Sequence, residues 1–247
     1  MKHKNLLLFL FAASTLAGGC AGDDHDNPVG IPEATLSARV TADGFAAEGG
    51  GGSRATETGY ATAFAKNDAI GVFVRKADGA FYANNLKVTR QADGSWKPAI
   101  RYVDGATCYA YYPHRDDMTG KTDVAAIIAA LPAPATNQSN ATLYTATDAM
   151  TATGIPDLAT GTLSLAFTHA RALVEIALPA GATDLTLDGI QPLALDSKWR
   201  YLAAPGSTVT LSGYYNRDGN RYTIPATPVT APATAGQYKT VTITEGK

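Results

Sequence analysis

Apolar and polar residues alternate along much of this chain, which is typical of β-strands that bury one face. The longest alternating stretch, residues 163–178, reads LSLAFTHARALVEIAL and has turn residues on both sides. The positions expected to face inward are Leu163, Leu165, Phe167 and His169, followed by Val174, Ile176 and Leu178. We interpret the stretch as one long, half-buried strand that forms the spine of a sheet, against which later strands pair.

Short alternating runs separated by turns make up most of the remaining chain. Asp-Gly turns at 78–79, 93–94 and 104–105 separate such runs in the first half, and residues 216–220 form another turn near the C-terminus. Regular turns between short strands favour an antiparallel β-sandwich or barrel. Only residues 123–131 (DVAAIIAAL) indicate a helix, so the sequence predicts an all-β protein with little helix.

One alternating run stands apart near the N-terminus, at residues 34–42. Its apolar face is formed by Ala34, Leu36, Ala38, Val40 and Ala42. Four glycines at 49–52 follow, and then Arg54 and Ala55. Glycine is costly to order and such a run stays open to proteases, so the bond after Arg54 is the expected site for an arginine-specific protease. The alternative is a flexible linker that carries an arginine by chance.

A cut at Arg54 would free the preceding strand to leave. The unpaired N–H and C=O groups beside its seat would then accept another extended segment. The run at 34–42 is therefore interpreted as a removable strand.

The first 19 residues have the form of a secretory signal. Lys2 and Lys4 precede an apolar run too short to span a bilayer, and small residues lead into Cys20. The Gly-Gly-Cys exit resembles the lipobox of bacterial lipoproteins, in which the cysteine is acylated, here by palmitate or a similar chain. Acidic residues at 23–26 resemble the tag that exports Bacteroidetes lipoproteins to the outer face of the outer membrane. Ordinary cleavage with a free cysteine, and a solvated acidic spacer, remain the alternatives.

The charge balance gives no reason to expect a nucleic-acid partner. Loss of the signal removes two lysines and leaves 18 basic against 22 acidic side chains, a net charge of −4. Charged residues make up only 17% of the chain, which suits short strands and tight turns. If Cys20 is acylated, Cys108 has no partner for a disulfide within the mature chain.

Catalytic motifs are not recognisable in the sequence, which lacks a P-loop, a Gly-x-Ser-x-Gly elbow and paired Cys or His metal spacing. The best local cluster, residues 114–117 (HRDD), is interpreted as a solvated loop. His169 is expected to be a hydrogen-bonded core residue, and Cys108 a small buried residue beside Tyr109, Tyr111 and Tyr112. These tyrosines are interpreted as core residues, with a ligand platform as the alternative. We expect no enzyme, no metal and no cofactor.

An ordered series of short motifs is similar to the fimbrillin family of Bacteroidetes, the pilus subunits related to the major and minor fimbrial proteins. After Phe64 the series runs NDAIGVFV (67–74), YAN (82–84), GSW (94–96), YAYYPH (109–114), QS (138–139), LYTAT (143–147) and the L-x-F-x-H pattern of 165–169. Each motif alone would be weak, and their order over about residues 36–247 carries the resemblance.

The resemblance implies two tandem transthyretin-like antiparallel β-sandwich domains. The expected limits are a signal at 1–19, a lipidated leader at 20–54, and domains at 55–155 and 156–247. It also implies a structural pilus subunit that assembles with other fimbrial subunits by strand donation after proteolysis, on the cell surface, with a role in adhesion to a host or bacterial ligand. The few residues after Thr244 favour a tip, accessory or anchor subunit, unless the last strand is itself donated.

A second hypothesis is a surface lipoprotein that binds glycans. Exposed aromatic side chains would form the binding surface, for instance Trp199, Tyr214 and Tyr215, although the same residues could belong to the core.

Overall fold

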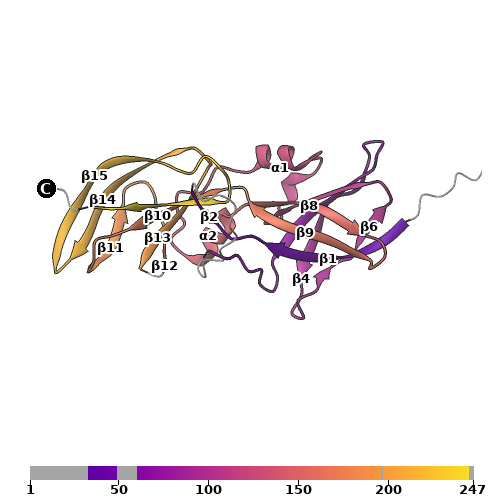
Figure 1. Ribbon diagram of the computed structural model, residues 1–247, viewed down its shortest axis with the longest axis horizontal. Coiled ribbons are helices and arrows are strands. Elements are labelled where there is room, and N and C mark those ends of the chain that lie inside the picture. The colour runs from indigo at the N-terminus through magenta and orange to yellow at the C-terminus, as the bar shows by residue number, and fades with distance from the viewer. Residues whose placement is uncertain (1–32, 49–59, 196, 245–247) are drawn as a thin grey trace, which may run out of the picture. The chain divides into compact units, whose positions relative to one another are not determined.

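Strands dominate the computed structural model, which describes residues 33–48, 60–195 and 197–244 (Figure 1). The strands are β1 (Glu33–Ala42), β2 (Ala46–Ala47), β3 (Ala69–Arg75), β4 (Phe81–Arg90), β5 (Trp96–Lys97), β6 (Ile100–Val103), β7 (Thr107–Tyr112), β8 (Met150–Asp157), β9 (Thr162–His169), β10 (Ala172–Ala177), β11 (Ala182–Leu187), β12 (Leu193–Leu195), β13 (Lys198–Ala203), β14 (Thr208–Arg217), β15 (Asn220–Thr230) and β16 (Gln237–Thr242). The helices are η1 (Asp116–Met118), α1 (Val124–Ala130) and α2 (Ala141–Thr147). The predicted all-β class is confirmed, and the transthyretin-like arrangement stays a prediction.

The first sheet of the described residues has the strand order β5-β4-β3-β7-β8-β9-β1-β6. Neighbouring strands are antiparallel except β1 and β9, which run parallel and lie side by side in Figure 1. Inward side chains of these strands form one apolar core that includes Leu36, Val72, Tyr112 and Phe167. The leading strand is therefore part of this sheet and contributes to its core.

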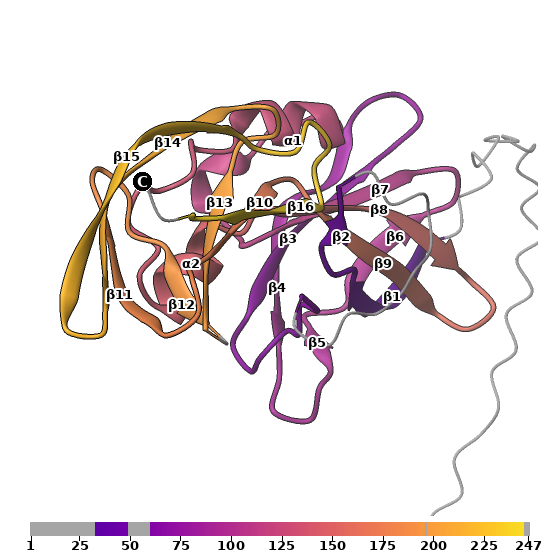
Figure 2. The ribbon, with the colours of Figure 1, turned by 60° about the vertical axis from the view of Figure 1, so that its left-hand side comes forward.

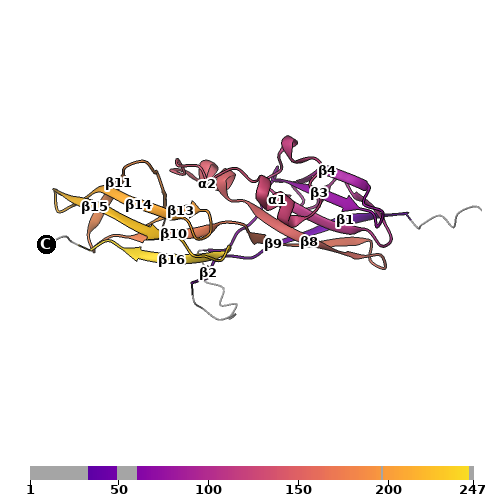
Figure 3. The same ribbon diagram turned by 90° about the horizontal axis from the view of Figure 1, so that it is seen from above.

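A second sheet has the order β12-β13-β10-β16-β2, and a third has the order β11-β14-β15. Figures 2 and 3 show β10 and β16 next to each other, with β2 at the end of β16. The two sheets enclose a separate apolar core that includes Val174, Leu211, Tyr215 and Ile224. Both β16 pairings are parallel, so the chain returns to the sheet in the direction of β10.

The stretch 163–178 is two strands and not the single spine that its alternation predicted. β9 pairs in the first sheet, whereas β10 pairs in the second. Between them, the Arg171 guanidinium donates to the carbonyl of Pro132 at 2.5 Å, and the Arg171 carbonyl accepts from the Gly236 amide at 2.7 Å. Later strands thus pair only with the second part of the stretch.

The chain passes from the first sheet to the second between His169 and Ala172. Both β8 and β9 pair in the first sheet. The chain therefore leaves that sheet later than residue 156, where we expect the second domain to begin. The four domain limits themselves stay predictions.

The two α-helices lie in the connection between β7 and β8. The helix expected at 123–131 is present as α1, where the Asp123 carboxylate caps the amide of Ala126. Ile127 of α1 packs with Phe73, Tyr109 and Tyr111 on the face of the sheet away from the main core. A second helix, α2, was not expected, and it begins where the Asn140 side chain accepts from the Leu143 amide at 3.0 Å.

Candidate functional site

Strand β1 lies between β9 and β6 in the first sheet. We call the groove that it fills the seat of β1. Residues 33–36 pair antiparallel with β6, and residues 37–42 pair parallel with β9. Leu36, at the changeover, is fully buried in the first core. The other four predicted inward residues are half-buried and pack against the same core, namely Ala34, Ala38, Val40 and Ala42. The predicted strand and its apolar face are confirmed, while its removal stays a prediction.

The chain beyond β1 continues as an extended segment into the second sheet. Backbone amides of this continuation donate to the carbonyls of Phe167, Tyr60, Gly236 and Tyr238, from Asp43, Phe45, Ala46 and Glu48 in that order. We call residues 33–48 the leader segment. Because it pairs with β6 and β9 of the first sheet and with β16 of the second, its departure would expose backbone groups of both.

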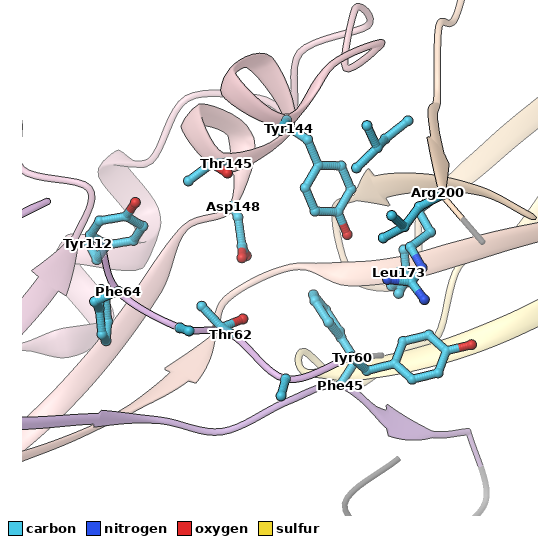
Figure 4. A pocket seen from close by; sticks show the side chains of 15 residues that line it. Phe45, Tyr60, Thr62, Phe64, Tyr112, Tyr144, Thr145, Asp148, Leu173 and Arg200 are labelled. Carbon is cyan, nitrogen blue, oxygen red and sulfur yellow. The ribbon is translucent and has the colours of Figure 1, made fainter. Parts of the chain in front are cut away.

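A pocket of about 250 Å³ lies beside the leader segment (Figure 4). Its labelled lining residues are Phe45, Tyr60, Thr62, Phe64, Tyr112, Tyr144, Thr145, Asp148, Leu173 and Arg200. Burial raises the pKa of both Tyr112 and Tyr144, so these phenols stay neutral. The lining is mostly aromatic and apolar, with a carboxylate and a guanidinium on opposite sides in the view.

His169 contacts three residues that line this pocket, each from a different segment of the chain. Its Nδ1 atom is 2.8 Å from the Asp148 carboxylate, and its Nε2 atom is 3.2 Å from the Thr62 hydroxyl. The ring of Phe45 stacks on the imidazole with a centroid distance of 3.8 Å. The expectation of a hydrogen-bonded core histidine is confirmed.

Glu175 is a fully buried carboxylate on β10 that the sequence did not single out. It accepts from the Lys198 ammonium at 2.5 Å, from the Thr240 hydroxyl at 3.0 Å and from the Tyr60 hydroxyl. Burial alone would raise the pKa of Glu175, but these hydrogen bonds outweigh it and lower that pKa. The site was missed because its donors lie 23, 65 and 115 residues away in sequence.

The predicted processing residues lie outside the described residues. Cys20, the expected lipidation site, precedes the first described residue, and Arg54 and Ala55 fall in the gap between residues 48 and 60. Lipidation and cleavage therefore stay predictions. On either side of that gap, Phe45 and Tyr60 lie close together, since the Phe45 amide donates to the Tyr60 carbonyl at 3.3 Å.

The tyrosine-rich strand β7 is buried on both faces. Cys108 and Tyr112 face the first core, whereas Tyr109 and Tyr111 pack under α1. Burial raises the pKa of the Cys108 thiol to about 12, so this thiol stays protonated at neutral pH. The interpretation of Cys108 and its neighbours as core residues is confirmed.

The cluster at 114–117 is only in part the solvated loop that the sequence predicts. Arg115 forms an exposed ion pair with Asp117 at 2.6 Å, as a solvated loop predicts. His114 differs from that expectation, because its side chain is 7% exposed and stacks near Tyr111. Burial lowers the His114 pKa and keeps the imidazole neutral at physiological pH.

The aromatic group suggested for glycan binding is only partly available at the surface. Tyr215 is 1% exposed and belongs to the second core, which corrects its assignment as an exposed residue. Trp199 is half-buried against the same core. Tyr214 is half-buried under the Arg221 guanidinium, 3.9 Å from its ring centroid.

Metal-ligand clusters and membrane-spanning helices are both absent from the described ranges, 33–48, 60–195 and 197–244. No three His, Cys, Asp or Glu side chains there could together hold a metal ion. None of the helices within these ranges has the length and apolar character needed to cross a membrane.

The all-β body that follows the leader segment is matched by a known family. Residues 53–245 fit the family described as "Fimbrillin-like", and this range is more than half of the chain. The chain therefore belongs to the fimbrillin-like family, as the ordered motifs predicted.

Among individual relatives, a Bacteroides ovatus protein named "Putative fimbrium tip subunit Fim1C" is 29% identical, over 96% of this chain and 48% of its own. The crystal structure of a fimbrial protein from Bacteroides ovatus has a TM-score of 0.63 and 25% identity, covering 86% of this chain and 49% of that one. A structure described as "a putative cell adhesion protein" from Bacteroides uniformis has a TM-score of 0.49 and 18% identity, covering 85% of this chain and 93% of that one. The chain spans about half the length of the first two.

Proposed function

We propose that this chain is a structural fimbrial subunit that assembles by strand addition after its leader segment is removed. An arginine-specific protease would cut after Arg54, the leader segment would dissociate, and an extended segment of another fimbrial subunit would occupy its seat. The observation that carries the proposal is the double pairing of β1, with β6 along one half and β9 along the other. A strand held mainly by backbone pairing and alternate apolar side chains is the kind that another chain can replace.

The order of segments along the chain supports this proposal. Arg54 lies between the leader segment, residues 33–48, and the next described segment, which begins at residue 60. A cut in that gap would break no pairing among the described strands. The body would keep the remaining strands of its sheets, β3 to β16.

A tip, accessory or anchor position fits better than a shaft position. The support is the name of the Bacteroides ovatus relative, which is that of a fimbrium tip subunit. Acylation of Cys20 would hold the uncut chain at the outer membrane, exposed at the surface, and cutting at Arg54 would release it from that anchor. Adhesion to a host or bacterial surface would then follow from its position at the fimbrium.

The test is the N-terminus of the protein recovered from purified fimbriae. We expect mature material to begin at Ala55, and an Arg54→Lys variant to keep its leader segment and to be missing from the fimbriae. Arg39→Lys is the matched control, because Arg39 is an exposed arginine of β1 itself, and this variant should be incorporated as the wild type is.

Two outcomes would contradict the proposal. Fimbriae that contain the chain with an N-terminus upstream of Arg54 would show that the leader segment stays in place during assembly. Recovery only as a membrane-bound monomer, with a glycan-array signal that Trp199→Ala abolishes, would favour the glycan-binding lipoprotein instead.

A further inference from the structure

We infer that the seat of the leader segment ends in a socket for one aromatic side chain, so that the incoming segment must carry a small residue followed by an aromatic one. This inference rests on the proposed function and adds the chemistry of the partner. The socket is now filled by Phe45, three residues beyond the last residue of β1.

Phe45 is the best-enclosed residue of the leader segment beyond β1. Only 8% of it is exposed, whereas its neighbours Gly44 and Ala46 are exposed. Its side chain packs with Leu173 of β10 and Leu202 of β13, which are almost fully buried. Three tyrosines line the same cluster, namely Tyr60, Tyr144 and Tyr238. This is the environment in which a single aromatic anchor contributes most to binding.

The floor of the socket is rigid and shaped for a flat ring. His169 stacks on Phe45 at 3.8 Å with an interplanar angle of 21°. The imidazole cannot turn freely, because Asp148 holds Nδ1 and Thr62 contacts Nε2. None of these partners belongs to the leader segment, so the socket would remain after the leader segment has left.

The residue before the aromatic must be small. A Cβ atom added to Gly44 would lie 2.7 Å from the carbonyl oxygen of Tyr60, which is backbone and cannot swing away. The Phe45 amide donates to this same carbonyl at 3.3 Å, so the leader segment and the segment that begins at Tyr60 are in direct contact here. An incoming segment with a larger residue at this point would be pushed away from the Tyr60 carbonyl.

The register then fixes the spacing along the partner. Leu36, the fully buried residue of β1, precedes Phe45 by nine positions. Beyond Phe45, Ala46 and Ala47 pair with Gln237 and Tyr238 of β16 and extend the second sheet. The partner that fits is an extended segment of a fimbrial subunit with a large apolar residue and alternating small apolar residues. A glycine eight positions after the large residue is followed directly by an aromatic residue.

The experiment uses the full chain after limited cutting by an arginine-specific protease. A fluorescent peptide of residues 33–48 is allowed to bind, and unlabelled peptides compete with it. We expect Phe45→Ala and Gly44→Val peptides to compete at least about tenfold more weakly than the native peptide. Thr41→Ala is the matched control on an exposed position of the same peptide, and it should compete within about twofold of native.

The outcomes separate this inference from the proposed function. Equal competition by the native and Phe45→Ala peptides would overturn the aromatic socket and leave strand addition intact. Equal competition by a peptide that ends at Ala42 would overturn it in the same way. If the native peptide itself never binds, the seat does not open after cutting, and both proposals fall.

Discussion

Glu175 keeps its charge inside the second sheet because its neighbours supply donors to both carboxylate oxygens. Lys198 and Thr240 donate to Oε1, and Tyr60 donates to Oε2. The Arg200 Nε atom is 3.7 Å from Oε2 and adds a second positive charge. A buried carboxylate without such partners would be strongly destabilising, so the four side chains act together.

Replacement of Glu175 by Gln should destabilise the fold at pH 7 by about 1–3 kcal/mol, because Lys198 and Arg200 then face a neutral group. The folded-state pKa of Glu175 is lowered, so its charge stabilises the fold above the ordinary carboxyl pKa and ceases to do so as the pH falls through the folded value. The difference between variant and wild type should therefore shrink as the pH falls below about 5 toward the lowered folded-state pKa. Urea unfolding at several pH values measures it.

The matched control is Glu33→Gln, in an ion pair at the surface. Glu33 and Arg101 are 2.8 Å apart, but both side chains are more than half exposed. Water and salt screen such a pair, and its removal should leave the unfolding free energy nearly unchanged. A Glu175→Gln variant as stable as the control at pH 7 would show that the buried charge contributes nothing.

Residue roles could be predicted from sequence where the local pattern determines them. His169 alternates with Leu165 and Phe167, and period-two alternation was enough to predict its burial. Glu175 lies between the predicted inward positions Val174 and Ile176, which indicates the opposite face of the strand, yet both faces of β10 are buried. The Glu175 side chain is covered by Tyr60 and Thr240, which are hydrogen-bonded to it. No local pattern reveals partners so distant in sequence.

At the scale of elements, the stretch 163–178 shows that alternation does not determine whether a run forms one strand or two. Odd-numbered residues of β9 enter the first core, whereas even-numbered residues of β10 enter the second. This change of phase was visible in the sequence, but it is compatible with one bent strand or with two strands. Helix α2 was missed because its sequence is rich in threonine, which is a weak helix former, and only Asn140 marks its start.

Leu36 should control how tightly β1 is held. It is fully buried among side chains of the first core, so Leu36→Ala should cost about 2–5 kcal/mol of local stability. We expect faster amide exchange across β1, measured by hydrogen–deuterium exchange of the uncut chain, with little change in β14 and β15. Thr35→Ala is the control, since Thr35 is the exposed neighbour in the same strand. Equal exchange in both variants would show that backbone pairing alone retains β1.

For the molecule as a whole, the important contrast is between the segments on either side of Arg54. The leader segment is retained by pairing along its length and by Phe45. The segment that begins at Tyr60 is retained by side chains of the second sheet. Tyr60 donates to Glu175, stacks on Tyr238 at 4.4 Å and lies under the Arg200 guanidinium. A cut between them should release the first segment and leave the second attached.

This contrast predicts how the cut chain responds to a second protease. Lys66 is exposed just beyond the Tyr60 segment, so a lysine-specific protease reports whether that segment stays docked. The wild type, cut after Arg54, should resist cleavage at Lys66. Tyr60→Ala removes the ring and the hydroxyl and should make the chain at least about tenfold more sensitive, because local opening then needs less free energy. Mass spectrometry of the product follows the cleavage.

One further variant separates two contacts of the Tyr60 side chain, and a second serves as its control. Tyr60→Phe keeps the stacking on Tyr238 but loses the hydrogen bond to Glu175, so it should fall between the wild type and Tyr60→Ala. Tyr214→Ala removes a half-buried tyrosine of the third sheet and should behave as the wild type does. If Tyr60→Ala resists the protease as well as Tyr214→Ala, the segment is anchored elsewhere. The socket for Phe45 would then lack the fixed Tyr60 wall on which the register of an incoming strand depends.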